Sequence, residues 1–234
     1  MKLTKLLLEY PGAFTPAPDD EVERNKQDQE KRRDPNYIVQ QYIKNGSKGD
    51  LDLTEINEDN QPETLYLKLT SLPDNLHVDG SLYLSLAVNL QYLPKNLKVK
   101  DDLFIEDSGI KELPADLEVG GGLWAAYSEL EHIPDNFTVS KSLLVSGSKI
   151  TYLPKGLRVG ESIRASSCNL KYLSDDIRTT NLFIYNTHVE EIPNSLMVEN
   201  FDCHNTPLAK KYTEKQIRDM IFSKGGMVDI IKNI

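Results

Sequence analysis

Residues 103–114 read LFIEDSGIKELP and residues 143–154 read LLVSGSKITYLP, so two stretches 40 residues apart follow nearly the same pattern. The pair Leu-Pro, or a close relative, recurs at steps of 21, 20, 20, 20, 20 and 19 residues: Leu72-Pro73, Leu93-Pro94, Leu113-Pro114, Ile133-Pro134, Leu153-Pro154, Leu173-Ser174 and Ile192-Pro193. A fixed period of this length is typical of repeat architectures. The sequence therefore predicts one array of repeats.

Apolar residues fall at fixed places in each repeat, in the pattern L-P-x-x-L-x-V-x-x-x-L-x-I-x-x-S-x-I-x-x-L-P. In LFI at 103–105 and LLV at 143–145, apolar residues flank a variable one, as in a short strand with one buried face. One repeat cannot bury that face alone, whereas stacked repeats bury it between neighbours. We therefore expect a repeat solenoid of mainly short parallel β-strands, with one strand-turn unit per 20 residues.

A column of small polar residues follows the predicted strands: Ser108, Ser128, Ser148, Cys168, Thr187 and Thr206. We expect these side chains to hydrogen-bond the backbone where the chain turns inward. Cys168 belongs to this column and Cys203 to an apolar one, so both are predicted to be packing thiols. Two cysteines do not imply a disulfide framework, and a reducing compartment is expected.

The stretch L-x-I-x-x-S-x-I-x-x-L-P resembles the leucine-rich repeat, with Ser or Thr at the usual Asn or Cys position. Its short period and Leu-Pro pair resemble the bacterial type found in secreted effector ligases, and the longer pattern is similar to uncharacterised repeat proteins of bacteriophages and some bacteria. The resemblance covers residues 51–208 and implies a leucine-rich-repeat-like solenoid. It names no partner, because such repeats bind many unrelated proteins. The ligases have a separate catalytic domain after their repeats, and because only about 27 residues follow here, ligase activity is not expected.

Helical caps are predicted at both ends of the repeats. Asp34 and Pro35 begin a helix that Gly46 ends, and Thr213 with Gln216 forms a capping box ahead of another helix and a short closing strand. The predicted division is therefore an N-terminal peptide and flexible linker at 1–34, a capping helix at 35–49, the solenoid at 50–208 and a C-terminal cap at 209–234.

The first ten residues, MKLTKLLLEY, admit two interpretations. Glu9 interrupts the leucines too early for a signal peptide, so secretion by that route is not expected. The segment could be a strand or helical turn resting on the solenoid. It also resembles the targeting peptide of internal capsid proteins of T-even-like phages, which is cut after Leu-x-Glu, so Glu9 is a candidate processing site.

The charge of the chain favours some partners over others. The net charge is −9, and residues 50–207 hold 12 Lys and Arg against 25 Asp and Glu. An acidic body repels phosphate backbones, so nucleic acid is not expected as a partner, whereas a basic protein surface is. No apolar run reaches the length of a membrane span, so no membrane partner is expected.

Motifs of catalysis and cofactor binding are missing from the sequence, including G-x-x-x-x-G-K-[ST], G-x-S-x-G, H-E-x-x-H and paired C-x-x-C. GGGLW at 120–124 falls at a fixed repeat position and is interpreted as a turn. The repeat pattern points Cys203 inward and His204 outward, which argues against a thiol nucleophile. We expect no enzyme activity, no catalytic residue, no metal, no cofactor and no small-molecule substrate.

The outward position of the predicted strands is rich in large side chains. Together with one residue of the adjacent outward column, it supplies the candidate partner-binding residues: Tyr83, Phe104, Trp124, Leu144, Arg164, Phe183 and Tyr185. In leucine-rich repeats this is the concave face. Exposed aromatic rows are typical of protein interfaces, but they could also be cross-strand packing, or the N-terminal tail could cover them.

The sequence therefore predicts a non-enzymatic protein-binding repeat module, of phage origin by resemblance, that uses this aromatic face. The alternative is a phage protein attached to the virion or packaged in its head, with the peptide ending at Glu9 as a capsid-targeting signal. The expected location is the host-cell cytoplasm or the virion.

Overall fold

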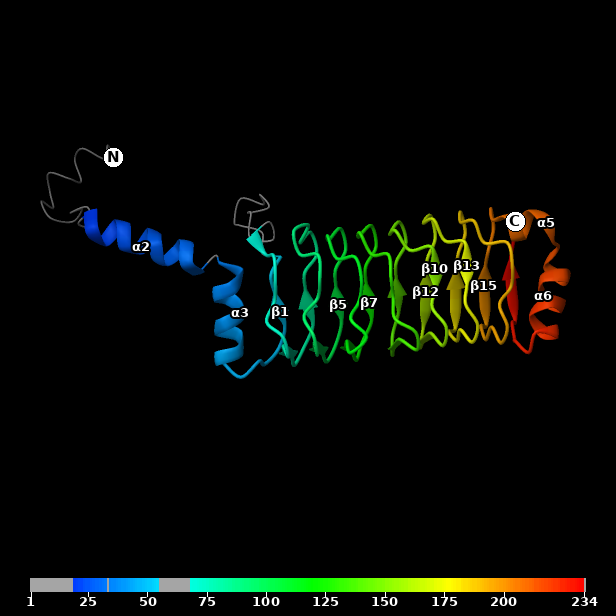
Figure 1. Cartoon of the computed structure of the whole chain (residues 1–234), viewed down its shortest axis with the longest axis horizontal. Coiled ribbons are helices and arrows are strands. Elements are labelled where there is room, and N and C mark those ends of the chain that lie inside the picture. Colours follow the sequence, from blue (N-terminus) through cyan, green and yellow to red (C-terminus); the bar gives the residue numbers. More distant parts are fainter. Residues whose placement is uncertain (1–18, 33, 55–67, 234) are drawn as a thin grey trace, which may run out of the picture.

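The computed structural model describes residues 19–32, 34–54 and 68–233, and it is a parallel β-solenoid with turns of about 20 residues (Figure 1). This confirms the predicted fold class. One parallel sheet of nine strands runs the length of the solenoid, in the order β1 (Leu51–Asp52), β3 (Leu82–Tyr83), β5 (Leu103–Phe104), β7 (Leu123–Trp124), β9 (Leu143–Leu144), β12 (Ser162–Arg164), β14 (Asn181–Phe183), β15 (Asn200–Asp202) and β16 (Ile230–Lys232).

Strand pairing places equivalent residues of successive turns side by side. Leu103 pairs with Leu82 on one side and Leu123 on the other, and all three are fully buried. The residue after each leucine lies on the outer face of the sheet, because successive side chains of a strand alternate between faces. The twenty-residue period therefore becomes straight columns of side chains along the solenoid.

A second set of short strands forms another side of each turn. It comprises a three-stranded sheet of β2 (His77–Val78), β4 (Lys98–Val99) and β6 (Glu118–Val119), and the pair β8 (Thr138–Val139) and β11 (Arg158–Val159). A third pair joins β10 (Tyr152–Leu153) to β13 (Tyr172–Leu173). The sequence identified one strand per repeat, and the structure adds these.

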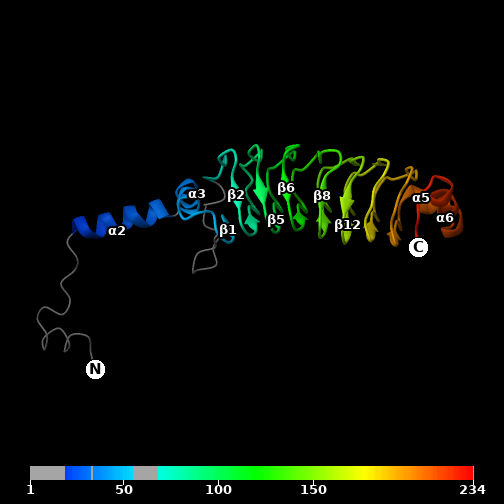
Figure 2. The ribbon, with the colours of Figure 1, turned by 90° about the horizontal axis from the view of Figure 1, so that it is seen from below.

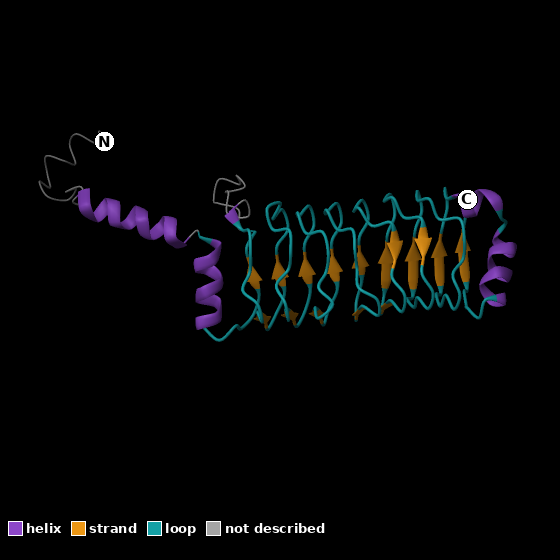
Figure 3. Ribbon diagram, in the orientation of Figure 1, coloured by secondary structure: helices purple, strands orange, loops and turns teal. Residues whose placement is uncertain are grey.

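Between the two ends of the solenoid the turns are extended. From His77 to Asp202, where the description is continuous, the chain contains no helix (Figure 3). Turns this short leave no room for a helix on the back. The inward columns merge into a single hydrophobic core, in which each fully buried Leu or Val contributes about 1.5–3 kcal/mol.

The small polar column binds the backbone within its own turn. Ser108 Oγ donates to the carbonyl oxygen of Ile105 at 2.7 Å, and Thr206 Oγ1 donates to that of Cys203 at 2.6 Å. Cys168 Sγ makes the equivalent contact with the Ala165 carbonyl oxygen at 3.0 Å. The column therefore satisfies carbonyls that would otherwise be buried without a donor, which is the structural role predicted for it.

Both predicted caps are present. In α3 (Pro35–Lys44) the carboxylate of Asp34 accepts the amide of Asn36 at 2.8 Å, and Val39 is buried against the core. At the other end lie α5 (Pro207–Lys211), which the sequence did not predict as a separate helix, and α6 (Glu214–Ser223) with the expected capping box. Strand β16 closes the sheet, as predicted for residues near the C-terminus.

A further helix, α2 (Asp19–Arg32), lies in the range predicted to be a flexible linker, and it extends away from the N-terminal end of the solenoid (Figures 1 and 2). Val22 is its single apolar residue, so it lacks the apolar stripe by which a helix is recognised in sequence. The rest of the predicted peptide and linker, residues 1–18 and 33, lies outside the described residues, and the segment boundaries remain predictions.

The hydrogen bonds of the small polar column lead to a prediction about stability. Changing Ser128→Ala should lower the free energy of unfolding by about 1–3 kcal/mol, because the buried carbonyl of Ala125 loses its donor. Urea denaturation measures the loss. Changing the exposed Ser71→Ala is the control and should cost less than about 0.5 kcal/mol. Equal effects of the two changes would contradict the role assigned to the column.

Candidate functional site

Four large side chains lie in a row on the outer face of the nine-stranded sheet, and we call them the aromatic stripe: Tyr83, Phe104, Trp124 and Leu144. Each is partly exposed, and strand pairing places each next to the following one. The ring centroids of Tyr83 and Phe104 are 4.6 Å apart with planes 3° from parallel. Those of Phe104 and Trp124 are 4.9 Å apart at 28°.

These distances fix how the rings are presented. Two rings lying flat on the sheet, edge to edge, would clash at centroid distances below 5 Å, so the rings must stack face to face along the solenoid. The faces of Phe104 are therefore shared with its neighbours. The stripe offers ring edges and the Leu144 side chain to solvent.

Gly122 makes room for the indole ring of Trp124. A Cβ atom at residue 122 would collide with the Cζ3 and Cη2 atoms of that ring, and it would lie 2.8 Å from the carbonyl oxygen of Ser142. The glycine that the sequence analysis interpreted as part of a turn therefore also sets the position of the indole.

The remaining predicted site residues lie on the same face, nearer the C-terminus. The guanidinium of Arg164 stacks over the ring of Phe183, 4.9 Å from its centroid. Tyr185 lies in the neighbouring outward column and stacks on His204 at 4.7 Å and 13°. The structure thus brings all seven candidate residues to one sheet face, in two groups: the aromatic stripe, and Arg164 with Phe183 and Tyr185.

A contact beside the second group does not follow from the repeat pattern. Asp202 is 8 % exposed, and its carboxylate lies 2.5 Å from Nδ1 of His204 and 3.6 Å from Nζ of Lys232. The two-residue spacing of Asp202 and His204 on one strand face could have indicated the first of these contacts.

A tyrosine in a strained turn is a second feature that the sequence analysis missed. Tyr127, in the turn after β7, has a φ of 57° and is 69 % exposed. In other turns this position holds Leu86, Asp107, Gly147, Ser167, Asn186 or Asn205. A bulky residue in the left-handed region costs about 1–2 kcal/mol, so a large residue in a column that is small or polar in every other turn except that of Leu86 was the available signal.

The two cysteines are packed in the core. Burial, followed by the nearby charge of Asp202, raises the pKa of Cys203 to about 12, and burial also raises the pKa of Cys168. Cys203 is fully buried while His204 is partly exposed on the outer face, so the two do not pair. Within the described ranges, no three His, Cys, Asp or Glu side chains are placed to hold a metal ion.

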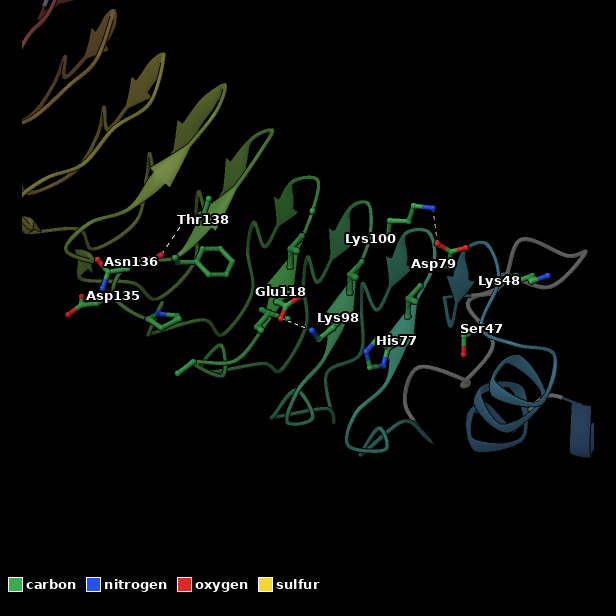
Figure 4. A pocket seen from close by; sticks show the side chains of 18 of the residues that line it. Ser47, Lys48, His77, Asp79, Lys98, Lys100, Glu118, Asp135, Asn136 and Thr138 are labelled. Carbon is green, nitrogen blue, oxygen red and sulfur yellow. Dashed lines mark hydrogen bonds and ion pairs between the residues drawn. The ribbon is translucent and has the colours of Figure 1, made fainter.

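Grooves lie over the second set of strands. One, of about 770 Å³, is lined by residues that include His77, Lys98, Glu118 and Thr138 (Figure 4), and another of about 440 Å³ continues past Arg158 and Arg178. In leucine-rich repeats the face that corresponds to the aromatic stripe is concave. These grooves lie instead over the second set of strands. Lys98 pairs with Glu118 and Lys100 with Asp79, each at 2.7 Å, so these cations have partners.

Comparisons with known proteins identify no family for the chain. No protein-family model matches it, and no curated protein matches it significantly. The structure itself shows a parallel β-solenoid with leucines at its strand positions and an exposed aromatic cluster. None of the helices in the described part of the chain has the length and apolarity needed to cross a bilayer.

The position of Trp124 can be tested directly, because it is the single tryptophan of the chain. Changing Gly122→Ala should displace the indole ring, shift its fluorescence emission to longer wavelength and lower the free energy of unfolding by about 1–3 kcal/mol. Ser142→Ala, at the equivalent position of the next turn, is the control and should leave the emission unchanged. An unchanged spectrum in the Gly122 variant would contradict the packing described.

Thiol reactivity tests the burial of the cysteines. A free thiol has a pKa of about 8.5, and the thiolate is the reactive form. Because burial raises both pKa values, the native protein at pH 8 should resist a thiol reagent, whereas both cysteines should react in guanidinium chloride. Rapid labelling of the native protein at pH 8 would contradict the assignment.

Proposed function

We propose that the chain is a non-enzymatic protein-binding module that contacts a partner protein through the aromatic stripe. The observation that supports this most is the row of stacked rings, continued by Leu144, on the outer face of a sheet. Rows of this kind leave apolar surface in contact with water, and a partner that covers this surface lowers the free energy. Aromatic anchors next to an arginine are also typical of interface hot spots.

The presentation of the rings favours a protein over a flat ligand. Nucleobases bind proteins by stacking on aromatic faces, and here the faces of Phe104 are already occupied by Tyr83 and Trp124. Ring edges and an aliphatic side chain suit apolar side chains of a protein surface instead. The acidic balance of the solenoid also opposes a phosphate backbone.

Charges around the stripe indicate the kind of surface that it fits. Asp52, Asp102 and Glu106 lie on the same sheet face at or next to the rows that hold Tyr83 and Phe104, and Arg164 lies beyond Leu144. A partner with apolar side chains flanked by basic groups would complement the end of the stripe near β1.

Two expectations from the resemblance remain predictions. Residues 7–9, with the candidate processing site Glu9, lie outside the described residues, and nothing in the described part favours a virion role over protein binding. The phage origin likewise rests on the resemblance alone.

Affinity capture from a lysate of the source cell tests the proposal. Wild type should retain a partner that is lost with the double variant Phe104→Asp, Trp124→Asp, because two buried charges would oppose the contact. Leu144→Asp is a milder variant of the same face and should weaken capture at least tenfold. Circular dichroism and thermal melting establish that each variant is folded.

The matched control changes two aromatic residues elsewhere on the solenoid. Tyr92 and Tyr172 are 58 % and 68 % exposed and lie outside the nine-stranded sheet, so Tyr92→Asp, Tyr172→Asp adds the same charges without touching the stripe. Capture should survive in this control. A partner retained equally by the folded stripe variants, or no partner for wild type, would contradict the proposal.

A further inference from the structure

The outward residues of six successive strands form a row that is complementary in charge to the same row in reverse order. From β1 to β12 they are Asp52, Tyr83, Phe104, Trp124, Leu144 and Arg164. If two copies of this row face each other in opposite directions, an acidic residue faces a basic one at each end, and apolar residues face each other in the middle. The facing pairs are Asp52 with Arg164, Tyr83 with Leu144, and Phe104 with Trp124.

We propose that the aromatic stripe is covered by a second copy of this chain, in a two-fold symmetric dimer with antiparallel solenoid axes. The inference rests on the proposed function, that the stripe is a protein-binding face, and it names the occupant of that face. A two-fold axis parallel to the strands, between Phe104 and Trp124, generates all the facing pairs. Such an interface is self-complementary, as closed dimers require.

The charges at the ends of the row are available for this contact. Asp52 is exposed, and its Oδ1 atom accepts hydrogen bonds from the amide and hydroxyl of Thr54. Arg164 is exposed and lies over the ring of Phe183. Within the described part of the chain, neither side chain forms an ion pair, so the dimer would contain the Asp52–Arg164 pair twice.

The columns on either side of the row also oppose each other without conflict. The same symmetry sets Asp102 against Gly122 and Glu106 against Ala126, so each carboxylate faces a small uncharged residue. Asp102 is already neutralised by Nζ of Lys141 at 3.0 Å. No two like charges of these columns face each other, which is the condition for electrostatic complementarity.

The size of the contact sets its expected strength. Six strands at ~4.8 Å spacing and three outward residues, which alternate with inward ones and so lie ~6.6 Å apart along a strand, give a face of roughly 30 by 20 Å per copy. This lies at the lower limit of specific interfaces, so a dissociation constant in the micromolar range is expected. The net charge of −9 on each copy opposes association, and the measurement belongs at about 0.15 M salt, where the Debye length is about 8 Å.

Sedimentation velocity on the full chain, from low micromolar to several hundred micromolar, tests the dimer and its arrangement together. Wild type should dimerise. Asp52→Arg alone and Arg164→Asp alone should each weaken the dimer at least tenfold, because each places like charges together at both ends. The double variant should recover the wild-type association. An equimolar mixture of the two single variants should form a heterodimer, since all of its end pairs are then opposite in charge.

Control reversals outside the nine-stranded sheet, Glu131→Arg and Lys171→Asp, change the net charge by the same amounts and should leave the dimer intact. Failure of the double variant and of the mixture to associate would overturn the antiparallel arrangement. A wild type that stays monomeric throughout would overturn the dimer. If that monomer still captured another protein through the stripe, the proposed function would stand without the dimer, whereas failure of both would overturn both.

Discussion

No turn of this solenoid can bury its own leucine face, and the core, the surface columns and the caps all depend on that constraint. Each turn of about 20 residues has apolar side chains on one side of a strand only two or three residues long, so its burial comes from the turns before and after it. Stacking in register then aligns equivalent residues of successive turns in columns along the solenoid. Inward columns become the core, and the two ends, which lack a neighbour, require α3 at one end and α5 with α6 at the other.

The same stacking turns one outward position into a surface. A large residue after the buried leucine would be an isolated exposed side chain in a single turn, whereas successive turns join Tyr83, Phe104, Trp124 and Leu144 into the aromatic stripe. Stacking of rings stabilises the sheet by about 0.5–1.5 kcal/mol per pair, but it leaves the ring edges in water. Because a solenoid is linear, the order of residues along such a row also decides whether the face complements another surface or its own reverse.

The repeat period was sufficient to predict the solenoid, the buried columns, the small polar column and the common face of all seven candidate residues, because each follows from a position that recurs. Both caps were predicted instead from local signals, Asp34 with Pro35 and Thr213 with Gln216. The second set of strands was missed although Leu97 and Val99 flank Lys98 as Leu103 and Ile105 flank Phe104, because only the second of these alternations was interpreted as a strand. Helix α2 was missed because it lacks an apolar stripe. The packing of the Trp124 ring against Gly122 and the contact of Asp202 with His204 depend on side-chain rotamers, which a repeat pattern does not encode.

The central claim is that the aromatic stripe is a face built to be covered, and the single tryptophan lies within it. The most direct measurement is acrylamide quenching of Trp124 fluorescence across a dilution series of the wild-type chain. The account predicts weak quenching at high concentration that rises several-fold on dilution, as the indole becomes exposed. Quenching that is equally strong at all concentrations, with or without a captured partner, would show that nothing covers the stripe and would contradict the account.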